Sequence, residues 1–111
     1  MIVDTEELLE EVEDDLEMLG QMFQIFEGDA EGRVARLRAA IEGGDANTVM
    51  EEAHALKGGV GNFFAMPVFE TAYKLEAMGQ SGDLADAAAT FAQLESQLST
   101  MKSEIQALIA S

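Results

Sequence analysis

LADAAATFAQLESQLSTMKSEIQAL, residues 84–108, is the stretch that decides the fold class. Its apolar residues are spaced alternately three and four positions apart, which is typical of one face of a helix that packs on other helices. The positions that fit are Leu84, Ala87, Phe91, Leu94, Leu98, Met101, Ile105 and Leu108. So many successive matches rarely arise by chance, so we predict one long helix here, with Asp83 as its N-cap.

Two earlier stretches carry the same helical spacing. A first long stripe ends at Gly43-Gly44, a pair that suits a helix C-terminus. Its apolar positions are Leu16, Leu19, Phe23, Phe26, Ala30, Val34, Leu37 and Ile41. A second helix is predicted to follow Asp45, which can act as its N-cap. The apolar positions of this helix are Val49, Ala53, Leu56, Val60 and Phe63.

A further helix is predicted after Pro67, because proline is favoured in a first helical turn. Its core side would consist of Val68, Ala72, Leu75 and Met78. Gly79 is predicted to stop this helix, so that Gln80-Ser81-Gly82 forms a short turn. A short leading helix is also predicted around residues 4–10, where it would cover one end of the molecule.

Together these elements predict an all-α chain. Only one proline is present, β-branched residues are sparse, and no alternating strand pattern occurs. Four amphipathic helices joined by short connections bury their stripes most simply as an up-down-up-down four-helix bundle. We therefore expect a single domain over residues 1–111, with a short extra N-terminal helix and with the Phe and Met residues of the stripes in its core.

Composition excludes several classes of function. The chain has 111 residues, no cysteine and one histidine, so neither a disulfide framework nor a multi-histidine zinc site is possible. Its net charge of −16 disfavours binding to nucleic acid or to an anionic membrane surface. No apolar run is long enough to span a bilayer, and the acidic N-terminus does not resemble a signal peptide. We expect a cytoplasmic monomer, and the initial methionine without linker-like ends favours a stand-alone chain.

The segment EEAHALKGGVGNFF, residues 51–64, contains the only histidine, His54, and three glycines close behind it. Each glycine inside a helix costs about 1 kcal/mol relative to alanine. On a helix His54 lies about 100° from the buried Ala53, so its ring should be exposed. Lys57, Gly58 and Gly61 would share its side of the helix. Two other interpretations stay open at this point: a purely structural histidine, and a loop formed by GGVGN.

The segment AHALKGGVGNFFAMPVFETAYKLE, residues 53–76, resembles the signature of histidine-containing phosphotransfer (HPt) domains. The resemblance implies that His54 accepts the phosphoryl group, that Lys57 steadies it, and that Glu76 orients the ring by accepting a hydrogen bond from its other nitrogen. Gly58 and Gly61 would keep the surface low for the partner. The chain departs from the pattern at Phe64, where many members have a glycine, and we expect Phe64 to contribute to the docking rim. Smaller departures are Gly59 and Val60, which replace common serines, and Gln80, which lies where some members carry a basic residue.

By the same resemblance the partner would be a response-regulator receiver domain, a sensor histidine kinase, or both. The chain offers a nucleophile and one cation but no nucleotide or Mg²⁺ site, so we expect no cofactor or metal of its own. Mg²⁺ would come with the receiver, and the chain would be a phosphotransfer intermediate, not an autonomous enzyme. Two rival functions are an acidic interaction bundle that binds a basic protein, and a small hydrolase that uses His54 and Glu76 as a general base.

Overall fold

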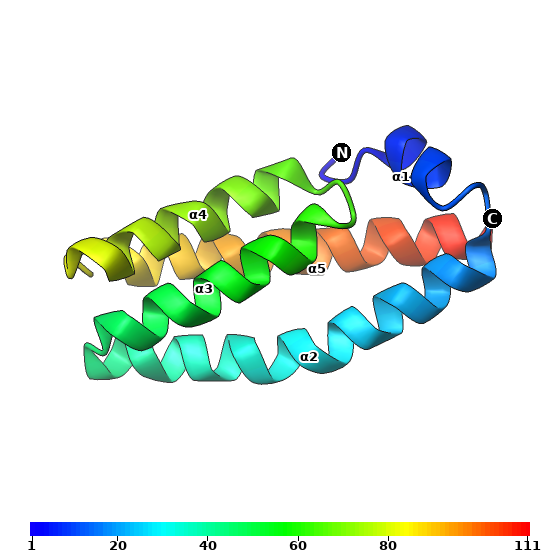
Figure 1. Ribbon diagram of the computed structural model, residues 1–111. Helices are drawn as coiled ribbons and strands as arrows, with labels where there is room; N and C mark the ends of the chain where they lie inside the picture. The colour runs from blue at the N-terminus through cyan, green and yellow to red at the C-terminus, as the bar shows by residue number, and fades with distance from the viewer.

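The computed structural model describes residues 1–111, which form five helices and no strand. The all-α prediction is therefore confirmed. The helices are α1 (Thr5–Glu11), α2 (Leu16–Gly43), α3 (Ala46–Gly61), α4 (Met66–Ser81) and α5 (Ala87–Ala110), as Figure 1 shows. None of these helices combines the length and the apolar character that crossing a membrane requires.

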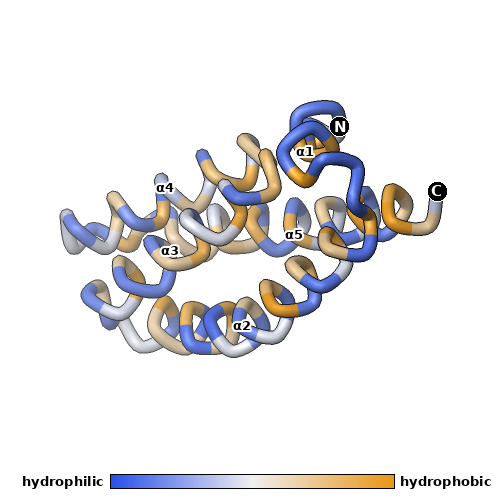
Figure 2. The backbone as a smooth tube through the Cα atoms, turned by 45° about the vertical axis from the view of Figure 1, so that its right-hand side comes forward, coloured by the Kyte–Doolittle hydropathy of each residue, from blue (hydrophilic) through white to orange (hydrophobic).

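The four longer helices pack in a closed cycle. Each of α2, α3 and α4 contacts the next helix along the chain, and α5 returns to contact α2 (Figure 1). Hydrophobic and hydrophilic stretches recur along each helix (Figure 2), as expected for helices that bury one face. The predicted stripes form this core. Their fully buried members include Leu19, Leu37, Leu56, Leu75, Leu94 and Met101.

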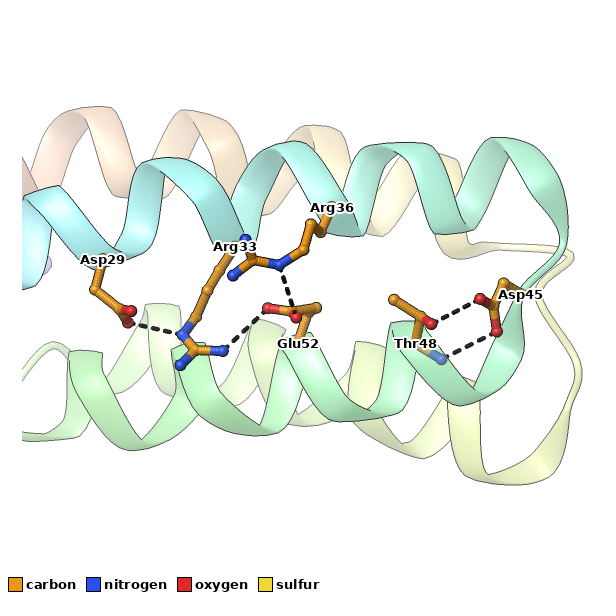
Figure 3. Close-up of polar contacts among 6 residues, drawn as sticks. All are labelled: Asp29, Arg33, Arg36, Asp45, Thr48 and Glu52. Atoms are coloured by element: carbon orange, nitrogen blue, oxygen red, sulfur yellow. Dashed lines mark hydrogen bonds and ion pairs between the residues drawn. The ribbon is translucent and has the colours of Figure 1, made fainter.

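Both termini of the α2–α3 connection are formed as predicted. Helix α2 is followed by Gly44, whose φ of 69° is the left-handed conformation in which glycine ends a helix without strain. Helix α3 is preceded by Asp45, whose carboxylate accepts hydrogen bonds from the Thr48 hydroxyl at 2.6 Å and the Thr48 backbone N–H at 3.2 Å (Figure 3). These bonds lower the pKa of Asp45, and the bond from the hydroxyl has the larger effect.

A buried carboxylate joins α2 to α3. Glu52 of α3 is 9% exposed and accepts hydrogen bonds from Arg33 at 3.1 Å and Arg36 at 3.0 Å (Figure 3). Arg33 also bonds Asp29 at 2.7 Å, and this bond is the main reason why the pKa of Arg33 is raised. Since Glu52 precedes His54 by two residues, the two side chains point about 200° apart around α3. The network therefore anchors α3 from the side facing away from the histidine.

The N-terminal segment is fastened at two places. The backbone N–H groups of Ile2 and Val3 donate to the carboxylate of Glu104 on α5, at 2.8 to 3.1 Å. The next residue, Asp4, donates its N–H to the carbonyl of Phe64 at 3.0 Å and caps α1 through its side chain. The leading helix predicted over residues 4–10 is thus present, one residue later than expected. It lies across the end of the molecule where α5 terminates (Figures 1 and 2).

The prediction that Gly79 stops its helix is wrong. Helix α4 continues to Ser81, and the left-handed residue that ends it is Gly82, with φ of 80°. Gly79 is instead buried inside the helix, where an added Cβ would lie 2.5 Å from the backbone nitrogen of Met50 and 2.7 Å from the carbonyl oxygen of Ala46. The glycine is therefore needed for the close approach of α4 to α3.

The prediction that Asp83 caps the last helix is also wrong. Helix α5 begins at Ala87, after Asp86, which forms no side-chain cap hydrogen bond. Asp83 accepts a hydrogen bond from the N–H of Ala85 at 3.1 Å, a local turn that competes with helix formation. Leu84 still packs against the core from this turn, which is why the apolar spacing extends beyond the helix.

Candidate functional site

His54 projects from the middle of α3, and its side chain is 66% exposed. The exposure agrees with the helical spacing, which placed the ring beside the buried stripe. The interpretation of GGVGN as a loop is wrong for its glycines, because Gly58, Gly59 and Gly61 all belong to α3. The turn begins only after Gly61, at Asn62.

The ring of His54 is held from the neighbouring helix. Its Nδ1 lies 2.7 Å from Oε2 of Glu76 on α4, and Glu76 is 8% exposed. Burial acts to raise the pKa of Glu76, but hydrogen bonds from Lys57 and His54 outweigh this effect and the pKa is lowered. The carboxylate is therefore ionised near neutral pH and can only accept, so Nδ1 carries the proton. The other ring nitrogen, Nε2, makes no hydrogen bond within the chain, and in the neutral ring this nitrogen carries the lone pair.

Lys57 binds the second oxygen of the same carboxylate. Its Nζ lies 2.7 Å from Oε1 of Glu76, and its side chain is only 20% exposed. The ammonium also lies over two aromatic rings of α4, at 5.8 Å from the centroid of Phe69 and 5.2 Å from that of Tyr73. Glu76 thus joins the only histidine of the chain to the ammonium of Lys57.

The three glycines have three different surroundings. A Cβ at Gly58 would have no neighbour within 4 Å, so this part of the helix surface is open. A Cβ at Gly61 would lie 3.4 Å from the ring of Phe69, an ordinary contact. Gly59 faces inward, where a Cβ would lie 2.8 Å from the ring of Phe26. The surface beside His54 is therefore low at Gly58, whereas Gly59 serves internal packing.

Comparisons with known proteins give a family match and a structural match. The model of the family described as Hpt domain matches residues 21–108. The chain belongs to the Hpt domain family. The crystal structure of histidine-containing phosphotransfer protein B (HptB) from Pseudomonas aeruginosa PAO1 is similar, with a TM-score of 0.89 and 26% identity over 98% of this chain and 95% of that one. A comparison with curated protein sequences finds no match. Family and fold together identify a histidine phosphotransfer module.

Phe64, which departs from the usual Hpt pattern, lies in the turn between α3 and α4. Its φ is 55°, a left-handed conformation that a residue with a side chain adopts only at a cost. A glycine would adopt this conformation without that cost. The ring is half-buried and packs against the core, and the carbonyl accepts the hydrogen bond from Asp4. A role of this ring in docking stays a prediction.

Sequence reasoning missed two residues of this Hpt site, Phe69 and Tyr73. They precede Glu76 by seven and three residues, and this spacing on a helix places all three on one face. That spacing could have indicated that these rings lie near Glu76. It could not indicate their contact with Lys57, because the sequence does not reveal that the Lys57 side chain turns toward α4.

Two further observations concern metal binding and the hydrolase interpretation. No group of three or more His, Cys, Asp or Glu side chains is placed to hold a metal ion. A cleft of about 730 Å³ lies between α2 and α5, and its lining includes neither His54 nor Glu76. The hydrolase interpretation would need a pocket at His54, so this cleft does not support it.

Proposed function

We propose that this Hpt domain carries a phosphoryl group on Nε2 of His54 and exchanges it with an aspartate of a response-regulator receiver domain. The observation that carries the proposal is an exposed imidazole whose Nδ1 is held by an ionised, buried Glu76. A kinase could load the same nitrogen. Lys57 is the cation available to offset the charge of the carried group.

The exchange follows from the protonation state of the ring. The lone pair of Nε2 attacks the phosphorus of an aspartyl phosphate, a new N–P bond forms, and the P–O bond to the aspartate breaks. The aspartate leaves as a carboxylate, and the positive charge that develops on the ring is stabilised by Glu76 at Nδ1. Transfer onward is the reverse sequence. Phosphoryl transfer depends mainly on positioning and charge neutralisation, and Mg²⁺ bound by the receiver would supply the remaining neutralisation.

In this proposal the chain acts as one monomeric domain over residues 1–111, with α2 to α5 as an up-down-up-down four-helix bundle. The cyclic packing of these helices supports the arrangement. The bundle would hold α3 and α4 rigidly side by side. Rigidity matters because a misplacement of about 1 Å at a transfer site can reduce the rate about 100-fold.

The test is direct phosphorylation. The protein is mixed with a receiver domain that a small acyl phosphate has phosphorylated, and we expect an acid-labile, base-stable phosphate on this chain, which ³¹P NMR assigns to Nε2. His54→Gln should accept none. Transfer that persists in His54→Gln would refute the assignment of the site. An unphosphorylated wild-type chain that still binds a basic protein would favour the interaction-bundle alternative.

A further inference from the structure

Lys57 is held in an unusual way for a surface lysine. Its side chain is only 20% exposed although His54, three residues earlier, is 66% exposed. A lysine stem has several rotatable bonds, and fixing it costs side-chain entropy. The ion pair with Glu76 fixes only the tip of this side chain. Other contacts of the side chain must therefore help to offset the entropy cost of fixing it.

Tyr73 supplies such a contact. Its ring centroid lies 5.2 Å from Nζ of Lys57, within the distance at which a ring face attracts a cation, and Phe69 adds a second ring at 5.8 Å. Tyr73 is 56% exposed and its hydroxyl makes no hydrogen bond within the chain. Neither core packing nor a hydrogen bond therefore accounts for a large aromatic residue at this position.

We propose that Tyr73 is a positioning residue for phosphotransfer. Its ring, together with that of Phe69, holds the ammonium of Lys57 beside Glu76, whose carboxylate also binds His54. This inference rests on the proposed function. A lysine whose side chain is already ordered beside Glu76 has less side-chain entropy to lose when the phosphoryl group arrives. A lysine free in solvent would have to be ordered at each transfer, which lowers the rate.

The first test observes Lys57 itself and needs no phosphate. A lysine side chain beside aromatic rings has upfield-shifted methylene proton signals in NMR spectra. We expect Tyr73→Leu to move the Lys57 methylene signals toward their solvent-exposed positions, and Tyr73→Phe to keep them, because phenylalanine retains the ring face. The Glu76 carboxyl carbon should titrate at higher pH in Tyr73→Leu, because the bond from Lys57 is one cause of its lowered pKa. Unchanged Lys57 signals in Tyr73→Leu would overturn the proposal.

The second test measures transfer. An exposed cation–π contact of the usual strength corresponds to about 2–5-fold in rate, so Tyr73→Leu should slow loading of His54 by that factor and Tyr73→Phe should not. Phosphoramidate serves as a small donor, which excludes an effect on docking of a protein partner. Met66→Ala is the matched control, since Met66 is a comparably exposed apolar residue of α4, 52% against 56%.

A double mutant connects the two residues. In a Lys57→Met background Tyr73→Leu should have no further effect on loading, because the cation that the ring positions is absent. An equal loss in both backgrounds would show that Tyr73 acts without Lys57 and would overturn the proposal. If the wild-type chain accepts no phosphoryl group from any donor, the proposed function fails, while the NMR measurement still decides whether Tyr73 positions Lys57.

Discussion

At the scale of single residues the site depends on Glu76, which is buried and yet bonds two groups. A buried carboxylate without partners would be strongly destabilising, because desolvation disfavours its charged form. Here His54 takes one oxygen at 2.7 Å and Lys57 takes the other at 2.7 Å. The carboxylate therefore has a hydrogen-bond partner at one oxygen and an ion-pair partner at the other, and it places the histidine and the cation at fixed positions relative to each other.

The lowered pKa of Glu76 predicts a pH dependence of stability. A group whose pKa is lower in the folded state stabilises the fold above its unfolded pKa, here about the ordinary value of 4.5, and this contribution is lost as the pH falls through the folded pKa. The free energy of unfolding of wild type minus that of Glu76→Gln should therefore decrease between pH 6 and pH 3. Urea unfolding at a series of pH values measures it.

The matched control for this pH series is Glu70→Gln. Glu70 is an exposed residue of the same helix and forms no ion pair or side-chain hydrogen bond. Its substitution should not reproduce the pH curve of Glu76→Gln. A wild-type advantage over Glu76→Gln that grows toward acid pH would contradict the sign of the effect.

The conformation of Phe64 gives a second residue-scale prediction. Both Phe64→Ala and Phe64→Gly remove the ring, but only alanine is strained at a φ of 55°. We expect the glycine variant to unfold with a free energy about 1 kcal/mol higher than that of the alanine variant, measured in urea. Neighbouring Asn62 has φ of −66°, so the order should be reversed there, with Asn62→Ala the more stable. The same order at both positions would contradict this explanation.

How far the site follows from sequence also differs residue by residue. The exposure of His54 follows from its position beside the apolar stripe, since helical geometry fixes the direction of every Cβ. The direction of the Lys57 side chain does not follow, because a four-carbon stem can reach several neighbours and the choice depends on α4. The left-handed conformation of Phe64 could not be inferred from the sequence, because phenylalanine rarely adopts it.

At the scale of helices the glycines of α3 and α4 predict opposite effects. Gly79→Ala would force a Cβ to within 2.5 Å of the backbone of α3, and backbone atoms cannot move aside as a flexible side chain can. We expect a loss of about 1–3 kcal/mol in the free energy of unfolding. Gly58→Ala meets nothing within 4 Å, so it should stabilise the fold by up to about 1 kcal/mol. Urea unfolding of both variants provides the comparison, and a neutral Gly79→Ala would show that the helices can separate at little cost.

The two errors in the predicted helix limits have a common cause. Glycine inside a helical pattern can end the helix or admit a neighbouring helix, and the sequence around Gly79 does not distinguish these uses. Similarly, Asp83 can cap a helix or form a local turn, and the apolar spacing at Leu84 fits both. The caps at Asp45 and Gly44 were predictable because the spacing changes there and no tertiary contact is needed to form them.

At the scale of the whole molecule the outstanding property is charge. The chain has 22 acidic and six basic residues, and every basic residue except Lys74 already takes part in an ion pair. Negative charge is therefore in excess, and most of this excess lies on residues 1–31, which carry twelve acidic residues and no basic one. Like-charge pairs outnumber opposite-charge pairs, so the summed long-range interaction opposes the compact state.

This excess predicts that salt stabilises the protein. The molecule measures 42 × 22 × 18 Å, and the Debye length is about 30 Å at 0.01 M salt but about 8 Å at 0.15 M. Charges on opposite sides of the bundle therefore repel at the lower concentration and are screened at the higher one, whereas ion pairs in direct contact are screened less. We expect the Tm to rise by several degrees between these concentrations, as thermal unfolding followed by circular dichroism would measure.

A double substitution tests the same repulsion. Glu10 and Glu11 are exposed in the last turn of α1, where negative charge also opposes the helix dipole. Replacing both by glutamine should raise the Tm at low salt and reduce its dependence on salt. A Tm that falls with salt would mean that the contacts between opposite charges, and not the repulsion across the molecule, dominate its electrostatics.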